Sequence, residues 1–423
     1  MRPKRIFIDM TQTCRNDLQT GIQRVVIHIF QEVQAISPSR ELESLGTVNS
    51  LKNFSLANLQ QRKASRGHRL AGLLKRFYAK LGIIPHLLPC RVRSSLIRAV
   101  NRFAYSSGGG IDKRRLVEFG DGDVLLLPEA NWTNPRWKAL RNARNKGARI
   151  VQIVYDLIPI AHPEFMHPES TYMFREWLVK TQQYVDAYIC DSKFVADELK
   201  TFMRQHTDTN APMPKIDHFV LGADIENKVS VGTIREKLRN ILPEDAAETA
   251  YLCVGTIESR KNQVYLLDAF EKIWKQCPTA KLILVGRMGW KGNDIATRIQ
   301  THPMLNKALF MFNDLSDSEL AYCYANCKAL LIPTLAEGFG LPVIEALAKG
   351  LPVFASDLEV LREVGQDFCT YFDVNDSHSL AKILRDVETR NQWPVVRDIA
   401  EFKATTWRES CAQLLDKIEQ VLQ

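Results

Sequence analysis

Two carboxylates flank a short loop that contains two glycines. The stretch is LAEGFGLPVIEALAKG, residues 335–350, in which Glu337 precedes the glycines and Glu345 follows them. It comes after the apolar run ALLIPT, so the pattern predicts a buried strand, a loop and a helix that begins near Pro342. The first N–H groups of a helix attract anions, and glycines let a ligand approach the backbone. Acceptors beside an anion site suit a sugar joined to a phosphate.

A second stretch supplies positive charge. The segment VGTIESRKN, residues 254–262, places Arg260 and Lys261 after a predicted strand and at the start of a helix. Adjacent cations can neutralise a diphosphate, with Arg as a fork and Lys as a point charge. Each stretch alone also has an explanation without a ligand. Glu337 and Glu345 would then be ordinary surface acids, and Arg260 and Lys261 a solvated basic pair. Together they favour a nucleotide-sugar site.

Short apolar runs alternate with helical patterns along the chain, which is typical of parallel sheets wrapped by helices. Ligands of such α/β sheets bind at the carboxyl ends of the strands. The predicted strands are RIFIDM, DVLLLPE, ARIVQIVYD, DAYICDS and KIDHFVLGAD in the first half, and AYLCVGT, AKLILVG, ALFMFND, ALLIPT and LPVFASD in the second.

The length of 423 residues exceeds what a single hydrophobic core usually covers, so we expect two domains. A polar segment at 223–248 separates the two strand series. We therefore place a first domain at 1–225, a second at 226–404 and an amphipathic C-terminal helix at 405–423.

The net charge of +8 is concentrated in one segment, because residues 62–115 contain fourteen Lys and Arg residues and a single acid, Asp112. Within it, helical spacing relates the apolar residues Leu70, Leu73, Leu74, Phe77 and Leu81. A basic amphipathic helix of this kind fits two roles. It either contacts an anionic membrane peripherally, or it covers the domain core with its apolar side while its basic side is solvated. No nucleic-acid motif accompanies the charge, so we expect no nucleic-acid partner.

Other features predict a cytoplasmic protein. The basic segment adds the hypothesis that the protein lies peripherally on the inner face of the cell membrane. No apolar run approaches a membrane span, and MRPKRIFIDM enters a strand pattern without a secretory segment. Nine cysteines without a C-x-x-C pair indicate reduced thiols. DGD at 121–123 precedes a strand, so we expect a turn there and no metal site. His162 and His167 are expected to be loop histidines.

With these residues in view, the chain resembles the retaining glycosyltransferases of family 4, which have the GT-B fold. Within that family it is similar to bacterial mannosyltransferases that build surface polysaccharides. The resemblance rests on TGIQRVV (20–26), VYDLIPIAHPE (154–164), CDSKFVADEL (190–199), VGTIESRKN (254–262), LILVGRMGW (282–290) and the long segment at 315–357.

The resemblance implies two Rossmann-like domains whose parallel sheets face each other across a cleft, with the last helix packed back on the first domain. It implies catalytic roles for Arg260 and Lys261, which would stabilise the leaving diphosphate, and for Glu337, which would orient the donor sugar. The implied donor-binding residues are Gly21, Gly255, Arg260, Lys261, Leu315, Glu337, Gly338, Phe339, Gly340, Leu341 and Glu345.

For the acceptor or sugar, the resemblance implies contacts by Arg24, Tyr155 and Asp156. Here the chain departs from the family pattern, because many relatives carry a histidine where this chain has Tyr155. A structural cap is an equally good reading of Asp156.

The implied reaction moves a hexose, with configuration retained, from a nucleoside-diphosphate sugar to a glycan or polyprenyl-diphosphate-linked acceptor. GDP-mannose is the favoured donor, and neither a cofactor nor a metal is expected. The alternative is a catalytically weak GT-B protein that serves as a membrane or partner adaptor. Turnover of a donor would separate the two hypotheses.

Overall fold

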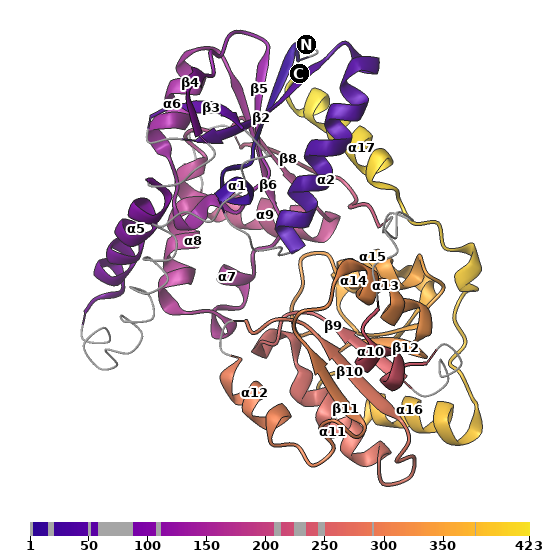
Figure 1. The fold of residues 1–423 in the computed structure, drawn as a ribbon. Coiled ribbons are helices and arrows are strands. Elements are labelled where there is room, and N and C mark those ends of the chain that lie inside the picture. Colours follow the sequence, from indigo (N-terminus) through magenta and orange to yellow (C-terminus); the bar gives the residue numbers. More distant parts are fainter. Residues whose placement is uncertain are drawn as a thin grey trace. The chain divides into compact units, whose positions relative to one another are not determined.

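The computed structural model describes residues 3–15, 21–49, 52–57, 88–106, 111–206, 213–223, 234–243, 250–289, 292–376 and 378–423. The chain forms two compact units, which we call unit 1 (Met1–Leu221 with Trp407–Gln423) and unit 2 (Gly222–Thr406) (Figure 1). The boundaries between the units lie after Leu221 and after Thr406, whereas the boundaries predicted from the sequence lie after residues 225 and 404.

Unit 1 is built on an eight-stranded sheet with the order β4-β3-β2-β1-β5-β6-β7-β8. Six strands pair in parallel, as predicted, whereas β3 pairs antiparallel with both β2 and β4. The strands are β1 (Arg5–Asp9), β2 (Glu43–Asn49), β3 (Phe54–Ala57), β4 (Ile111–Leu116), β5 (Asp123–Leu127), β6 (Arg149–Val154), β7 (Ala187–Cys190) and β8 (Lys215–His218).

Helices cover this sheet, and one apolar cluster that includes Phe7, Leu125 and Trp177 forms between them. The helices are α1 (Thr11–Arg15), α2 (Gly21–Ile36), α5 (Cys90–Ser106), α6 (Trp137–Asn145), α7 (Ile158–Ala161), α8 (Pro168–Thr181), α9 (Lys193–His206) and α17 (Trp407–Val421), with 3-10 turns η1 (Ser37–Arg40), η3 (Asn131–Thr133) and η4 (Pro163–Phe165).

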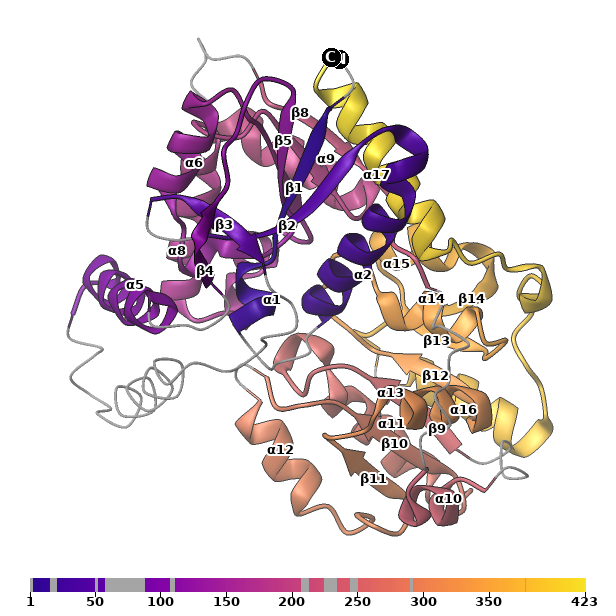
Figure 2. The ribbon, with the colours of Figure 1, turned by 45° about the horizontal axis from the view of Figure 1, so that its top comes forward.

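The last helix, α17, packs against α2, β7 and β8 of unit 1, which confirms the prediction for the C-terminal helix. Both ribbon views show it beside α2 (Figures 1 and 2). The rings of His28 and Trp407 stack with centroids 4.6 Å apart. Arg40 forms a 2.6 Å ion pair with Asp416.

Unit 2 is built on a six-stranded sheet with the order β11-β10-β9-β12-β13-β14, in which every pairing is parallel. Its core includes Tyr251, Phe270 and Phe354. The elements are β9 (Ala250–Val254), β10 (Lys281–Val285), β11 (Leu309–Phe312), β12 (Ala329–Ile332), β13 (Val353–Ser356), β14 (Cys369–Phe372), α10 (Glu236–Ile241), α11 (Gln263–Ile273), α12 (Asn293–Gln300), α13 (Asp317–Asn326), α14 (Leu341–Leu347), α15 (Glu359–Gly365), α16 (Ser379–Arg390), η5 (Ser259–Lys261), η6 (Gln366–Phe368) and η7 (Ile399–Glu401).

The strand order locates the edge at which each unit can bind a ligand. In unit 2 the chain winds outward from β9 to one side and from β12 to the other, so these neighbours form the topological switch point. In unit 1 the corresponding neighbours are β1 and β5. Loops that follow such a pair of strands diverge, and the crevice between them is where open α/β sheets bind ligands.

All ten predicted strands are present, whereas β2, β3, β4 and β14 were not predicted. No cysteine forms a disulfide, and all nine lie in the described part of the chain. Gly122 adopts a φ of +90° within DGD, so the predicted turn is confirmed. The helix predicted around Leu70 to Leu81 lies outside the described residues. Within those residues, no helix is both long enough and apolar enough to cross a bilayer.

Candidate active site

The two predicted donor segments meet at the switch point of unit 2. Lys261 and Arg260 lie on η5, directly after β9, and Glu337 lies in the loop after β12. The ammonium group of Lys261 donates to Oε1 of Glu337. Nη1 of Arg260 donates to Oε2 of the same carboxylate at 3.0 Å. One carboxylate is thus held by two cations.

Backbone contacts fix the two loops against each other. The carbonyl of Arg260 accepts the Leu335 N–H at 2.7 Å and the Thr334 hydroxyl at 3.1 Å. Ser356, at the end of β13, donates its hydroxyl to the Thr334 carbonyl at 2.6 Å. The sequence reading missed Thr334 and Ser356, because a hydroxyl at a strand end carries no pattern that identifies its partner.

Charge is closely balanced around Glu337. Its side chain is 9% exposed, and burial raises the pKa of this carboxyl, but Lys261 and Arg260 outweigh burial and hold the pKa below its usual value. Arg260 also donates through Nε to Glu258 at 2.8 Å, a residue that the sequence reading missed. An ammonium has three N–H donors, and the bond to Glu337 uses one of those on Lys261. Glu337 therefore fixes the positions of both cations before any ligand binds.

The predicted helix after this loop is α14, and a proline occupies its first turn as expected. Gly340 precedes it with a φ of +97°, and a Cβ there would lie 2.7 Å from Cδ2 of Leu361. The positive φ favours glycine at this position, whereas the close contact is with the end of a side chain that can shift. The helix has only seven residues, so the side-chain cations contribute more positive charge here than its dipole does.

Glu345 projects from α14 and is buried, with its Oε2 accepting the Tyr324 hydroxyl at 2.8 Å. Tyr324 lies on α13 and is itself buried. The sequence reading did not identify Tyr324, because only the tertiary structure brings a residue of α13 to a residue of α14 that is 21 positions away. The hydroxyl fixes the position of the carboxylate.

The segment around Leu315, one of the implied donor-binding residues, is also fixed by ion pairs. Ser316 and Glu319 form a capping box at the start of α13. Arg235 binds Glu319 at 2.5 Å and Asp314 at 2.9 Å. A hydrogen bond from Arg235 lowers the pKa of Glu319 to about 2. Leu315 therefore stands in a short, anchored loop.

The remaining predicted donor residues occupy varied environments. A Cβ at Gly255 would lie 3.6 Å from side-chain carbons of Lys261, so this glycine lies beside the lysine stem. Gly338 and Phe339 are buried, and Leu341 is half-buried. Gly21 is exposed at the start of α2 in unit 1. Its contact with a donor stays a prediction.

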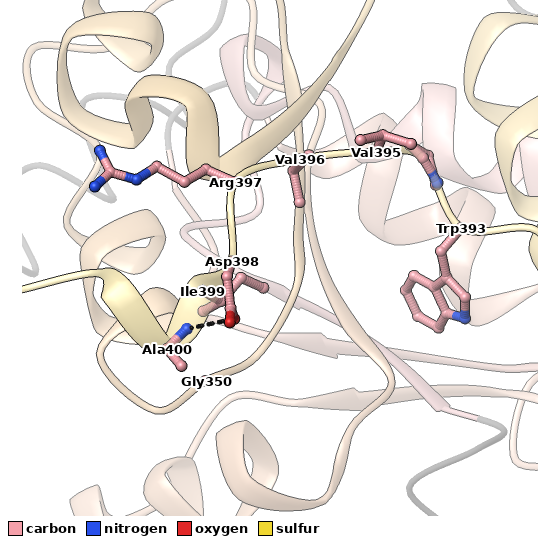
Figure 3. A pocket seen from close by; sticks show the side chains of 9 residues that line it. Gly350, Trp393, Val395, Val396, Arg397, Asp398, Ile399 and Ala400 are labelled. Atoms are coloured by element: carbon pink, nitrogen blue, oxygen red, sulfur yellow. Dashed lines mark hydrogen bonds between the residues drawn. The ribbon is translucent and has the colours of Figure 1, made fainter.

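A shallow cavity of about 560 Å³ lies elsewhere in unit 2, between Gly350 and the segment before α17 (Figure 3). Its wall includes Trp393, Val395 and Ile399, and Val395 is fully exposed. Asp398 accepts the Ala400 N–H at 3.0 Å, which shapes one end of the cavity. None of the predicted donor residues lines it.

Unit 1 has its own polar cluster at the ends of β1 and β5, which the sequence reading did not identify. Glu129 accepts the N–H groups of Gln12 and Thr13 at 2.6 and 2.7 Å. Asp9 accepts the Asn131 side-chain amide at 3.1 Å. Burial, followed by the charge of Asp9, raises the pKa of Glu129 to about 8. The cluster fixes the loop that contains α1.

We expect this pair of acids to make the stability of unit 1 depend on pH. The pKa of Glu129 lies near 8 in the folded chain against an ordinary 4.5, so the folded state retains a proton that the unfolded state releases in that window. The free energy of unfolding should therefore fall as pH rises from 4.5 to 8, by about 1.4 kcal/mol per pH unit from this group.

Denaturant titrations of wild type and Glu129→Gln at pH 5.5, 6.5 and 7.5 check this expectation. Glu129→Gln should lose the pH dependence that Glu129 contributes to the free energy of unfolding. At low pH its free energy of unfolding should also be lower than that of wild type. Glu118→Gln, a substitution of an exposed glutamate, should retain the wild-type slope. Equal slopes in wild type and Glu129→Gln would contradict the assignment.

The predicted acceptor contacts lie in the same unit. The hydroxyl of Tyr155 donates to the Pro128 carbonyl at 2.7 Å, and its ring is buried. A phenol has one hydrogen to donate, so this bond weighs against donation by Tyr155 to a sugar. Asp156 accepts the Ile158 N–H at 3.1 Å, a local contact just before α7, whose N-cap residue is Leu157. Arg24 is half-buried in the first turn of α2.

No group of three or more His, Cys, Asp or Glu side chains that could hold a metal ion occurs among the described residues. His162 lies 3.2 Å from Glu164 in an exposed loop, as expected of a loop histidine.

Comparison with known proteins fixes the family of unit 2. Residues 234–401 match the model of the family described as Glycosyl transferases group 1. Unit 2 is a group 1 glycosyltransferase domain. The matched range contains the whole site formed by Arg260, Lys261, Glu337 and Glu345. The predicted family resemblance is confirmed.

Relatives of this chain include the serotype-specific mannosyltransferase WbdA of Escherichia coli, at 32% identity over 309 residues. The match covers 71% of this chain but only 38% of WbdA, so the chain spans well under half of that relative. The O-antigen chain mannosyltransferase B of Escherichia coli is 30% identical over 39% of this chain and 44% of its own length.

Among solved structures, sucrose-phosphate synthase from Thermosynechococcus elongatus is similar, with a TM-score of 0.63 over 99% of both chains. Its sequence identity is 14%, so this likeness concerns the fold. The prediction of a GT-B chain with two Rossmann-like units is confirmed.

Proposed function

We propose that this chain is a retaining, metal-independent glycosyltransferase of bacterial surface-polysaccharide synthesis. It would move a hexose from a nucleoside-diphosphate sugar, with GDP-mannose as the favoured donor, to a glycan or polyprenyl-diphosphate-linked acceptor. The observation that supports this most is the binding of the buried Glu337 carboxylate by Lys261 and Arg260 at the switch point of unit 2. The mannosyltransferase names of the relatives support the choice of sugar.

The chemistry follows from where charge develops. Cleavage of the anomeric C–O bond leaves an oxocarbenium-like sugar and adds negative charge to the departing nucleoside diphosphate. Lys261 and Arg260 lie in fixed positions and stabilise that charge without reorganisation. The acceptor hydroxyl attacks on the face that the phosphate leaves, and a phosphate oxygen takes its proton.

Glu337 then acts as an orienting and electrostatic group. Each of its two oxygens accepts a hydrogen bond from a cation. Such bonds hold its lone pairs and reduce its nucleophilicity, so the carboxylate is poorly suited to form a glycosyl-enzyme bond. Its negative charge can instead stabilise the positive sugar.

Removing the Tyr324 hydroxyl should weaken donor binding. We propose that Glu345 accepts hydrogen bonds from the nucleotide ribose, and Tyr324 fixes that carboxylate at 2.8 Å. Tyr324→Phe should raise the KM for the donor roughly 5- to 30-fold, with kcat nearly unchanged, from the loss of a hydrogen bond to a charged group. Tyr322→Phe, on the same helix, is the matched control. A change confined to kcat would contradict this role.

The experiment that tests the proposed function measures nucleoside-diphosphate release from GDP-, UDP-, ADP- and dTDP-sugars, with and without a lipid-linked acceptor extract. Selective turnover of GDP-mannose, unchanged by EDTA, is the expected result. Activity lost to EDTA and restored by Mg²⁺ or Mn²⁺ would contradict metal independence. Proton NMR of the product should show the anomeric configuration of the donor, and inversion would contradict retention.

The adaptor alternative predicts a different outcome. A catalytically inactive GT-B protein would neither bind nor turn over any donor in the panel. Donor binding without turnover would point to a missing acceptor, and a second round with fractionated glycolipid would follow. Vesicle binding alone does not separate the two functions, since both predict it.

A further inference from the structure

Helix α5 exposes two large apolar side chains, Val92 and Leu96, and buries two polar ones, Ser94 and Asn101. Leu88, Val92 and Leu96 are 37%, 43% and 45% exposed. Val92 and Leu96 lie four positions apart on one side of α5, and Leu88 lies two residues before its first residue, Cys90; we call these three side chains the stripe. Ser94 and Asn101, on the opposite side, are buried. A surface helix of a soluble domain normally has the reverse arrangement.

Polar contacts on the inner side fix this orientation. Arg93 pairs with Glu169 at 2.5 Å, and both side chains are largely buried. Arg98 pairs with Glu176 at 2.5 Å. Asn101 donates to the Thr133 carbonyl at 3.2 Å. Both acids belong to α8, so rotating α5 to bury Val92 and Leu96 would break two ion pairs.

The stripe stands out from the rest of the described surface. Ten large apolar side chains are exposed there, and three of them are Leu88, Val92 and Leu96. The other seven are distributed over several elements of both units. Both ribbon views place α5 at the margin of unit 1, on the outer side of α8 (Figures 1 and 2). Contiguous exposed apolar surface marks an interaction site.

The charge of the chain indicates which partner this stripe fits. The sequence before Leu88, residues 62–87, contains seven Lys and Arg residues and no acid. Arg91 is exposed next to Val92. Apolar side chains with adjacent basic residues suit the headgroup region of an anionic bilayer. One helical stripe is also narrow compared with the roughly 800 Å² that a stable protein interface covers on each partner.

We propose that the stripe of Leu88, Val92 and Leu96 inserts into the headgroup region of an anionic membrane. This surface differs from the segment around Leu70 to Leu81 on which the sequence prediction of membrane contact rested. Membrane docking does not require donor turnover. Either proposal, docking or transferase activity, can therefore fail while the other holds.

Sedimentation of the full chain with vesicles of phosphatidylcholine and phosphatidylglycerol tests this. The double variant Val92→Gln/Leu96→Gln should bind these vesicles at least tenfold more weakly than wild type. Met213→Gln/Val395→Gln removes two exposed apolar side chains elsewhere and should bind within twofold of wild type. Vesicles of phosphatidylcholine alone should bind wild type weakly, since their surface lacks the complementary charge.

A second readout applies even if the double variant folds poorly. In Leu96→Trp, brominated lipids should quench more tryptophan emission than they quench in wild type. Equal quenching, or unchanged vesicle binding by the double variant, would overturn the proposal. A shift of the double variant from dimer to monomer in sedimentation velocity, with vesicle binding unchanged, would overturn it in favour of a contact between copies.

Discussion

Replacing Lys261 with alanine should lower kcat/KM for sugar transfer by roughly 10³-fold, the loss expected when one preorganised donor to a developing negative charge is removed. The ammonium group is close to Glu337 and stands beside Arg260 at the switch point. It neutralises charge on the departing diphosphate, and water in the resulting space would be a weaker and less ordered donor. The effect should therefore fall mainly on kcat.

Steady-state kinetics with GDP-mannose, or with whichever donor the panel identifies, measure this effect. Lys275→Ala removes an exposed lysine from the same unit and should leave both kcat and KM unchanged. Thermal unfolding of Lys261→Ala shows whether the site remains folded. Transfer by Lys261→Ala within tenfold of wild type would contradict the role of this cation in leaving-group departure.

Replacing Glu337 with alanine should reduce transfer by roughly 10²- to 10³-fold, and added azide should not restore activity. A carboxylate nucleophile, once removed, leaves space in which azide can attack the sugar from the opposite face. Glu337 is expected to orient the sugar and the two cations, so azide has no step to replace. Loss of the carboxylate also leaves Arg260 and Lys261 close together without their shared counter-charge.

Because that change removes a counter-charge from two partly buried cations, Glu337→Gln is a necessary companion variant. It keeps the shape of the side chain, and it should still lose at least tenfold in kcat, because the negative charge opposite the sugar is gone. Glu359→Ala, at the exposed start of α15, is the matched control. Formation of a glycosyl azide with inverted configuration by Glu337→Ala would identify Glu337 as a nucleophile and contradict the orienting role.

The two predictions concern a cluster whose members are distant in sequence. Arg260 and Glu337 are 77 positions apart, and they meet because β9 and β12 are neighbours in the sheet. Motif resemblance identified both residues, but a spacing in sequence does not give the distance between two atoms. The additional contact of Arg260 with Glu258 was also unpredictable, because acids near a basic residue in sequence are common.

The sequence by itself determined the buried strands, the α/β class and the donor motifs, since apolar runs and Gly, Pro and charge patterns are local properties. It did not identify β2 (Glu43–Asn49), whose seven residues mix polar and apolar types, or β14 (Cys369–Phe372), which has only four residues. Only the tertiary structure decided which strands are neighbours, and hence that Asp9 meets Glu129 and Tyr324 meets Glu345. It also decided which side of α5 faces solvent, because ion pairs with α8 override the hydrophobic pattern that would otherwise orient the helix.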